Sequence, residues 1–134
     1  MRKEQRIRIA FICIHNSCRS QMAEALAEAF FGGIFESYSA GTDISGGVNK
    51  DAVRIMKERY GIDMNGHTAK TISDIPVPDI AVRMGCGVEC PYIGPVRIED
   101  WGLADPSGKD DGEYVRTAGD ILKKLQELSS ELRR

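Results

Sequence analysis

The chain has 134 residues, four cysteines and a formal net charge of −2. This length fits a single domain, residues 1–134, with a hydrophobic core, and the near-neutral charge without a basic block gives no indication of nucleic-acid binding. No apolar stretch approaches the length of a membrane span, and residues 1–6 lack the apolar part of a secretion signal. A cytoplasmic protein is expected, in which cysteines favour catalytic or metal-binding roles over structural disulfides.

The first predicted element is a buried strand over residues 7–12, a nearly continuous apolar run rich in isoleucine. An amphipathic helix follows from Ser20, because Met22, Leu26 and Phe30 recur every fourth residue among glutamates and alanines. Residues 35–40 form a second, short strand.

A second helix is predicted from its ends: Asn49 can cap it and Gly61 can end it, with Ala52, Val53, Met56 and Tyr60 on one face. Further strands are predicted at residues 80–84 and 96–98. A long C-terminal helix is indicated by apolar residues spaced by three and four, namely Val115, Ala118, Leu122, Leu125, Leu128 and Leu132. This alternation predicts an α/β fold, a three-layer domain whose four-stranded parallel sheet has helices on both faces.

Residues 13–20, Cys-Ile-His-Asn-Ser-Cys-Arg-Ser, join the first strand to the first helix. Backbone N–H groups at the start of a helix attract an anion, and Arg19 adds a planar fork of donors. The same field favours the thiolate of Cys13, so the loop combines an oxyanion cradle with a nucleophile. The predicted oxyanion-binding residues are Ile14, His15, Asn16, Ser17, Cys18 and Arg19. A buried structural cysteine is the alternative, but the flanking strand and helix favour an active loop.

The sequence resembles the low-molecular-weight protein tyrosine phosphatase superfamily and, within it, the thioredoxin-coupled arsenate reductases. At position 21 the sequence resembles the reductase branch, because it carries glutamine where the phosphatases tend to carry proline. The likeness runs nearly end to end through the 13–24 loop and helix start, residues 39–42, 61–63, His67, Cys86, Cys90-Pro91, Trp101-Gly102 and Asp105-Pro106.

This resemblance implies a catalytic set beyond the loop. Asp105 is expected to protonate the leaving oxygen, and Ser20 to donate a hydrogen bond to the Cys13 thiolate. For arsenate, Cys13 would form a covalent adduct. Cys86 and Cys90 would then relay the oxidation as a disulfide while arsenite leaves. Thioredoxin is the reductant that the resemblance implies, and a small thiol stays open.

The sequence departs from the better-known reductases in three respects. Cys86 and Cys90 are separated by only three residues, fewer than in those reductases. His15 replaces a small loop residue and receives no role, and none is assigned to Arg83 in the third strand. The last departure is at positions that bind potassium in some members, Asn16, Glu24, Ser39 and Thr68, because Lys70 stands where those members carry an acid. No metal or cofactor is therefore expected, and Asn16 and Ser39 are expected to brace the loop.

Two alternatives remain. The first is a protein tyrosine phosphatase that hydrolyses phosphomonoesters through a Cys13 thiophosphate. Against it, the residues after Asp105-Pro106 lack the aromatic that would flank a phosphotyrosine ring. The second is a non-catalytic zinc module whose four thiolates are Cys13, Cys18, Cys86 and Cys90. In each case a monomer without nucleic-acid or membrane partners is expected.

Overall fold

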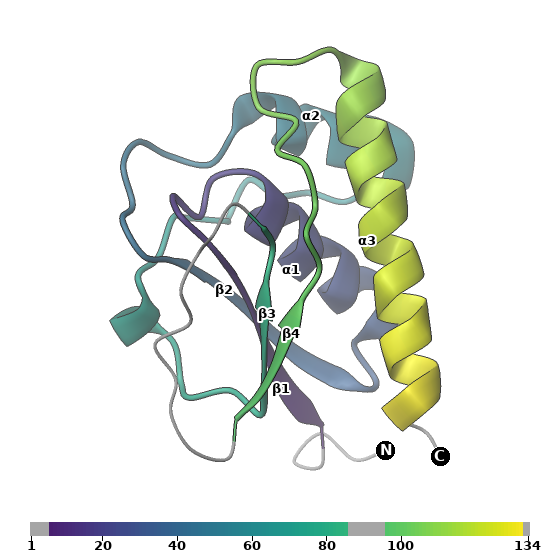
Figure 1. Cartoon of the computed structure of the whole chain (residues 1–134). Coiled ribbons are helices and arrows are strands. Elements are labelled where there is room, and N and C mark those ends of the chain that lie inside the picture. Colours follow the sequence, from purple (N-terminus) through teal and green to yellow (C-terminus); the bar gives the residue numbers. More distant parts are fainter. Residues whose placement is uncertain (1–5, 86–95, 133–134) are drawn as a thin grey trace.

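The computed structural model describes residues 6–85 and 96–132, so the expected redox cysteines Cys86 and Cys90 lie outside the described residues. Its centre is a four-stranded, wholly parallel sheet with strand order β2-β1-β3-β4 (Figure 1). The strands are β1 (Ile7–Cys13), β2 (Phe35–Gly41), β3 (Ile80–Arg83) and β4 (Arg97–Asp100). The predicted strands are thus present, with the fourth shifted towards its carboxyl end.

The register of the sheet brings the carboxyl ends of the strands to one edge. Cys13 is paired with Gly41 across β1 and β2, and Ile12 is paired with Arg83 across β1 and β3. Arg83 is in turn paired with Asp100 of β4, and their side chains form an ion pair at 3.1 Å. Ligands of open parallel sheets bind at this edge, so the register places the loop after β1 where a site is expected.

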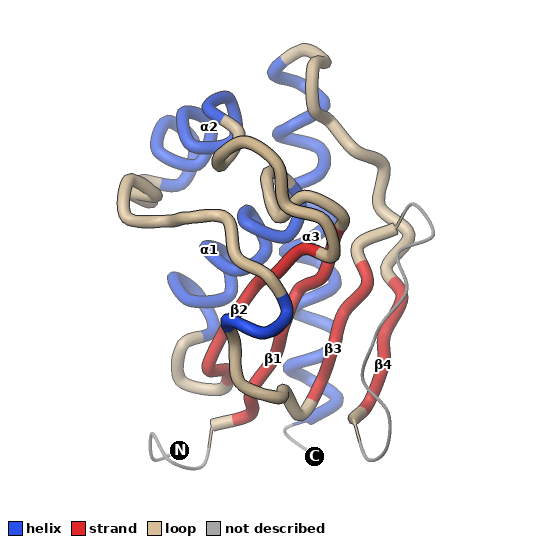
Figure 2. The backbone as a smooth tube through the Cα atoms, turned by 90° about the vertical axis from the view of Figure 1, so that its left-hand side faces the viewer, coloured by secondary structure: helices blue, strands red, loops and turns tan. Residues whose placement is uncertain are grey.

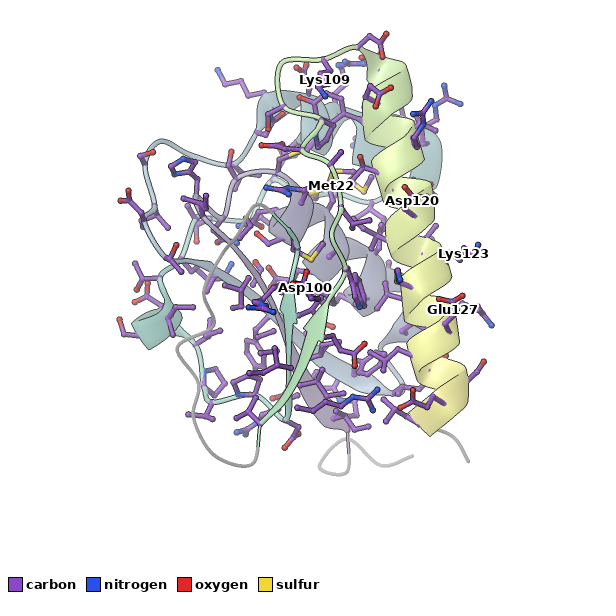
Figure 3. The ribbon with its side chains drawn as sticks, in the orientation of Figure 1. Met22, Asp100, Lys109, Asp120, Lys123 and Glu127 are labelled. Carbon is purple, nitrogen blue, oxygen red and sulfur yellow. The ribbon has the colours of Figure 1, made fainter. Side chains whose placement is uncertain are left out.

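The α-helices α1 (Arg19–Phe31) and α3 (Asp111–Leu132) lie on one face of the sheet, and α2 (Lys50–Tyr60) packs against both of them on the same side (Figures 1 and 2). Their buried side chains share one core with β1 and β3, formed around Phe11, Met22, Leu26, Tyr114 and Ile121. Asp120, Lys123 and Glu127 point from α3 away from the sheet (Figure 3), as the polar face of an amphipathic helix requires. None of the helices in the described part of the chain is long and apolar enough to span a membrane.

The second face of the sheet carries a smaller cluster of Ala10, Ile12 and Ala40. Among the described residues, its helical cover is the 3-10 helix η2 (Ile72–Asp74), which contributes Ile72 to this cluster. The predicted fold class, a parallel four-stranded α/β sheet between helical layers, is confirmed, with the α-helices gathered on one side.

The helix ends follow local chemistry. The Asn49 side chain accepts a hydrogen bond from the Ala52 amide at 3.0 Å, and Gly61 ends α2 in the left-handed conformation at φ 67°. Both ends of α2 were predicted. The prediction that Phe30 lies on the buried face of α1 was wrong, because its side chain is 52% exposed and packs edge-on against Tyr60. Steps of four residues rotate slowly around a helix, so Phe30 lies about 80° from Met22.

Candidate active site

Cys13 lies at the end of β1, at the base of the loop that leads into α1. Its side chain is 5% exposed, and its Sγ lies 2.8 Å from the Ser20 hydroxyl. Asn16 holds the loop in a tight curve with φ 51°, in the left-handed region that asparagine tolerates better than most residues. The loop packs directly against the backbone of Gly41, where a Cβ would lie 2.6 Å from the Ile14 carbonyl oxygen. A glycine is therefore needed behind the loop.

A chain of buried hydrogen bonds runs beneath the loop to the sulfur. Gln21 Nε2 donates to Asn16 Oδ1 at 2.9 Å and to the Thr68 carbonyl at 2.9 Å, so Gln21 Oε1 faces His67 Nδ1 at 3.0 Å. His67 Nδ1 must therefore carry a proton. Asn16 Nδ2 then donates to Ser20 Oγ at 2.9 Å.

The direction of this chain follows from its acceptors. Asn16 Oδ1 already accepts from Gln21 and from the Lys70 amide at 2.8 Å, which fixes the orientation of the Asn16 side chain. Because Ser20 Oγ accepts from Asn16, the Ser20 proton is left for Cys13 Sγ. From Gln21 through Asn16 and Ser20, each residue thus donates a hydrogen bond to the next, and the last of these bonds reaches the Cys13 sulfur.

Arg19 presents two edges of its guanidinium group. The side chain is 5% exposed, and Nη1 donates to the Leu103 carbonyl at 2.7 Å and to the Met84 carbonyl at 3.4 Å. Gly85 lies against this edge, because a Cβ on it would be 3.2 Å from Arg19 Nη1. Nη2 lies 4.0 Å from Asp105 Oδ2. The backbone thus holds one edge in place and leaves the charge directed towards the loop.

Asp105 stands at the mouth of the loop. Burial alone would raise the pKa of its carboxyl group, but hydrogen bonds from Ser107 and the nearby Arg19 charge outweigh burial and lower it. The Ser107 amide donates to Asp105 Oδ1 at 3.0 Å. Asp105 is consequently a carboxylate in the free protein, placed where it can take up a proton once an anion offsets Arg19.

Cys18 is also buried, but its surroundings differ from those of Cys13. Its Sγ contacts Met22 Sδ at 3.8 Å, and burial raises the pKa of its thiol to about 12. Met22 lies on α1 in the interior of the protein (Figure 3). Cys18 is therefore a neutral thiol at physiological pH, and its contribution to the predicted cradle is its backbone.

The loop opens into a cavity of about 390 Å³. It brings together most of the predicted loop residues, and His15 lies at its rim with Nδ1 2.7 Å from the Asp43 carbonyl oxygen. The lining residues are Cys13, Ile14, His15, Ser17, Cys18, Arg19, Ser45, Asn49, Asp105 and Ser107. Sequence reasoning missed Ser45, Asn49 and Ser107 as site residues. The helix-cap signal at Asn49 marked a residue that also contacts the loop, since its backbone N–H donates to the Ser17 carbonyl oxygen at 2.9 Å.

Asn16 Oδ1 accepts a hydrogen bond from the Lys70 amide, and the Ser39 hydroxyl donates to Glu24 of α1. Their expected roles in bracing the loop stay predictions. The Lys70 ammonium group lies 3.4 Å from Glu24 Oε1 and 3.0 Å from the Thr68 carbonyl oxygen. Two of the four residues that the resemblance would assign to potassium, Glu24 and Thr68, thus already contact a cation of the protein. Within the described ranges, no three His, Cys, Asp or Glu side chains cluster as metal ligands would.

The chain matches the model of the low molecular weight phosphotyrosine protein phosphatase family over residues 8–134. It belongs to this family. The family includes relatives that are named as reductases: arsenate reductase 1 of Staphylococcus haemolyticus is 41% identical over 92% of this chain and 96% of its own length. Arsenate reductase 1 of Staphylococcus epidermidis is 40% identical over 91% of this chain and 95% of its own length.

The fold of this family member agrees with solved structures. An arsenate reductase in a phosphate-binding state has a TM-score of 0.83 and 32% identity, covering 93% of this chain and 98% of that one. A low molecular weight protein tyrosine phosphatase from T. tengcongensis has a TM-score of 0.78 and 25% identity, covering 93% and 99%. This chain is thus similar to proteins named for each of the two chemistries that the sequence left open.

Proposed function

We propose that this protein is an arsenate reductase in which Cys13 attacks an arsenate ion bound in the 13–19 loop. The observation that carries the proposal is the Cys13 sulfur, 2.8 Å from the Ser20 hydroxyl at the base of a cavity that also holds Arg19 and Asp105. Arsenate has the shape and charge of phosphate, so a loop of backbone amides and one guanidinium group suits it. The naming of the relatives favours this function over the phosphatase and zinc alternatives.

The first step is formation of a Cys13–arsenate adduct. The thiolate bonds to arsenic, and one arsenate oxygen leaves as water after receiving a proton. We assign that proton to Asp105. Binding of the oxyanion offsets the Arg19 charge that helps to lower the pKa of Asp105, so the carboxylate gains proton affinity as the substrate binds.

The second step transfers two electrons to arsenic. The Cys86 thiolate attacks the Cys13 sulfur, the electron pair of the sulfur–arsenic bond moves to arsenic, and arsenite leaves. Cys90 then attacks Cys86, which releases Cys13 as a thiolate and leaves a Cys86–Cys90 disulfide. We expect thioredoxin to reduce this disulfide, because a structurally similar arsenate reductase from Corynebacterium glutamicum is thioredoxin-dependent. That structure is 28% identical with a TM-score of 0.76, covering 94% of this chain and 63% of that one.

The test is arsenate reduction with thioredoxin, thioredoxin reductase and NADPH, measured beside hydrolysis of 4-nitrophenyl phosphate. Cys13→Ser should abolish both activities, since both need the nucleophile. Cys86→Ser and Cys90→Ser should abolish only arsenate turnover, and Cys90→Ser should stall as a Cys13–Cys86 disulfide visible in peptide mass spectra. Replacing thioredoxin with glutathione tests the reductant. Normal arsenate turnover by both relay variants would refute the relay and favour the phosphatase.

Phosphomonoester hydrolysis is the second candidate, because Cys13, Arg19 and Asp105 are sufficient for it and need no further thiol. Ser107 follows Asp105-Pro106 where an aromatic wall would hold a phosphotyrosine ring, so the structure favours small substrates. A monomeric state and a cytoplasmic location stay predictions; gel filtration with light scattering would check the first.

A further inference from the structure

Two polar residues from distant parts of the chain line the cavity beside the 13–19 loop. Asn49 comes from the start of α2 and Ser107 from the segment before α3. Asn49 Nδ2 lies 3.5 Å from Ser107 Oγ, so the two side chains meet at the mouth. Asn49 has no role in the chemistry proposed above, and Ser107 takes part in it only through its hydrogen bonds to Asp105.

The orientation of the Asn49 amide is fixed by its acceptors. Oδ1 accepts from the Ala52 amide at 3.0 Å and from the Tyr114 hydroxyl at 3.4 Å. Tyr114 is fully buried, so this hydroxyl is a fixed anchor behind Asn49. Because the Ala52 amide and the Tyr114 hydroxyl both donate to Oδ1, the other end of the side-chain amide, Nδ2, must face the cavity. It carries two protons and has one distant partner among the described residues, Ser107, so it can donate to a ligand.

Ser107 links this amide to Asp105. Its backbone N–H donates to Asp105 Oδ1 at 3.0 Å, and its hydroxyl group also hydrogen-bonds the Asp105 carboxylate. When Asp105 becomes protonated, its carboxyl group no longer needs that hydroxyl proton. The hydroxyl group can then turn towards the cavity, beside the Asn49 amide.

In-line attack by Cys13 places three oxygens of a tetrahedral ion in the loop and directs the fourth outward, opposite the sulfur. We propose that Asn49, with Ser107 beside it, is a specificity-determining residue that donates a hydrogen bond to this outward oxygen. The outward oxygen of an inorganic oxyanion can accept this hydrogen bond from Asn49. An aryl ester instead has an uncharged bridging oxygen at this position, which accepts a hydrogen bond more weakly, and it places a ring against Asn49, which a polar site penalises. This inference rests on the proposed function, since it explains a preference for inorganic ions over esters.

The test measures binding, because two probes occupy the site without turnover: inorganic phosphate and phenylphosphonate. Calorimetry on the reduced full chain would compare wild type with Asn49→Ser. Serine caps a helix as well as asparagine, so α2 keeps its start while the amide donor is lost. Phosphate should bind about tenfold more weakly, and phenylphosphonate within about twofold of wild type, the change expected for one hydrogen bond to a charged ligand.

Controls separate this role from a general loss of structure. Asn65→Ser makes the same change at an exposed position away from the cavity, and it should alter neither affinity. Ser107→Ala should weaken phosphate a few-fold and spare phenylphosphonate, with the exposed Ser130→Ala as its match. Thermal unfolding would verify that each variant is folded.

The ratio of the two affinities decides the inference. If the ratio of phosphate to phenylphosphonate affinity in Asn49→Ser stays within twofold of the wild-type ratio, the inference is wrong. This applies both when neither affinity changes and when the two affinities decrease by the same factor. Failure of the proposed function is a separate result: wild-type protein would then reduce no arsenate with thioredoxin, while the ratio of phosphate to phenylphosphonate affinity would still support or overturn the role of Asn49.

Discussion

Gly41→Ala should displace the oxyanion loop without altering any group that takes part in the chemistry. A Cβ at this position would lie 2.6 Å from the Ile14 carbonyl oxygen and 2.9 Å from the Asn16 amide nitrogen. The loop would have to retreat by roughly 0.8 Å to restore an ordinary contact. Because a misplacement of about 1 Å can cost about a hundredfold in rate, we expect kcat/KM for arsenate to fall about tenfold.

The same change should destabilise the protein by about 1–3 kcal/mol, as overpacking of a tight contact does. For a domain of this size, that corresponds to a fall in Tm of roughly 4–12 °C. Steady-state kinetics at 25 °C and calorimetric unfolding would measure the two effects. Gly33→Ala is the control, since a Cβ there meets nothing within 4 Å. Unchanged kinetics in Gly41→Ala, with or without a lower Tm, would refute the claim that this contact positions the loop.

The thiol of Cys18, with its pKa raised to about 12 from 9.0, should react with iodoacetamide at pH 8 about a thousandfold more slowly than an unperturbed thiol. Peptide mass spectrometry should find Cys13 labelled before Cys18, and equal labelling of the two thiols would contradict the raised pKa of Cys18. Gly85→Ala should raise KM for arsenate several-fold, because its Cβ would press on Leu103 and on Arg19 Nη1; Gly102→Ala, also at positive φ but in open space, should leave KM unchanged. Replacing potassium with sodium at constant ionic strength should leave arsenate turnover within about a third of its value, since Lys70 already supplies a cation to Glu24; a severalfold loss in sodium would show that the ammonium group does not fill this role.

Features that depend on neighbours in sequence could be predicted from the sequence. The strand, loop and helix around Cys13 follow from an apolar run, a helix start and the residues between them. The ends of α2 follow from Asn49 and Gly61, whose local chemistry is sufficient. The wrong prediction for Phe30 also came from local spacing, which does not reveal where a helix extends beyond the surface against which it packs.

Features that depend on distant segments could not be predicted. The contact of Arg19 with the Leu103 carbonyl joins residues 84 positions apart, and that of His67 with Gln21 joins residues 46 apart. Arg83, which had no assigned role, pairs with Asp100 only because β3 and β4 lie side by side. Asn49 illustrates the limit most clearly. Its cap function was visible in the sequence, whereas its place in the cavity depends on how α2 packs against α3.

The two cysteines of the loop show how the fold distinguishes residues that the sequence presents alike. Cys13 receives a hydrogen bond from Ser20, the last donor of a chain in which each residue donates to the next. Cys18 has Met22 as its neighbour, and burial there keeps its thiol protonated. Both side chains are about 5% exposed, so burial is not what separates them. The difference lies in the surroundings: the hydrogen-bonded chain beneath the loop ends on Cys13, whereas Cys18 packs against Met22 and its burial outweighs its hydrogen bond with Ser107.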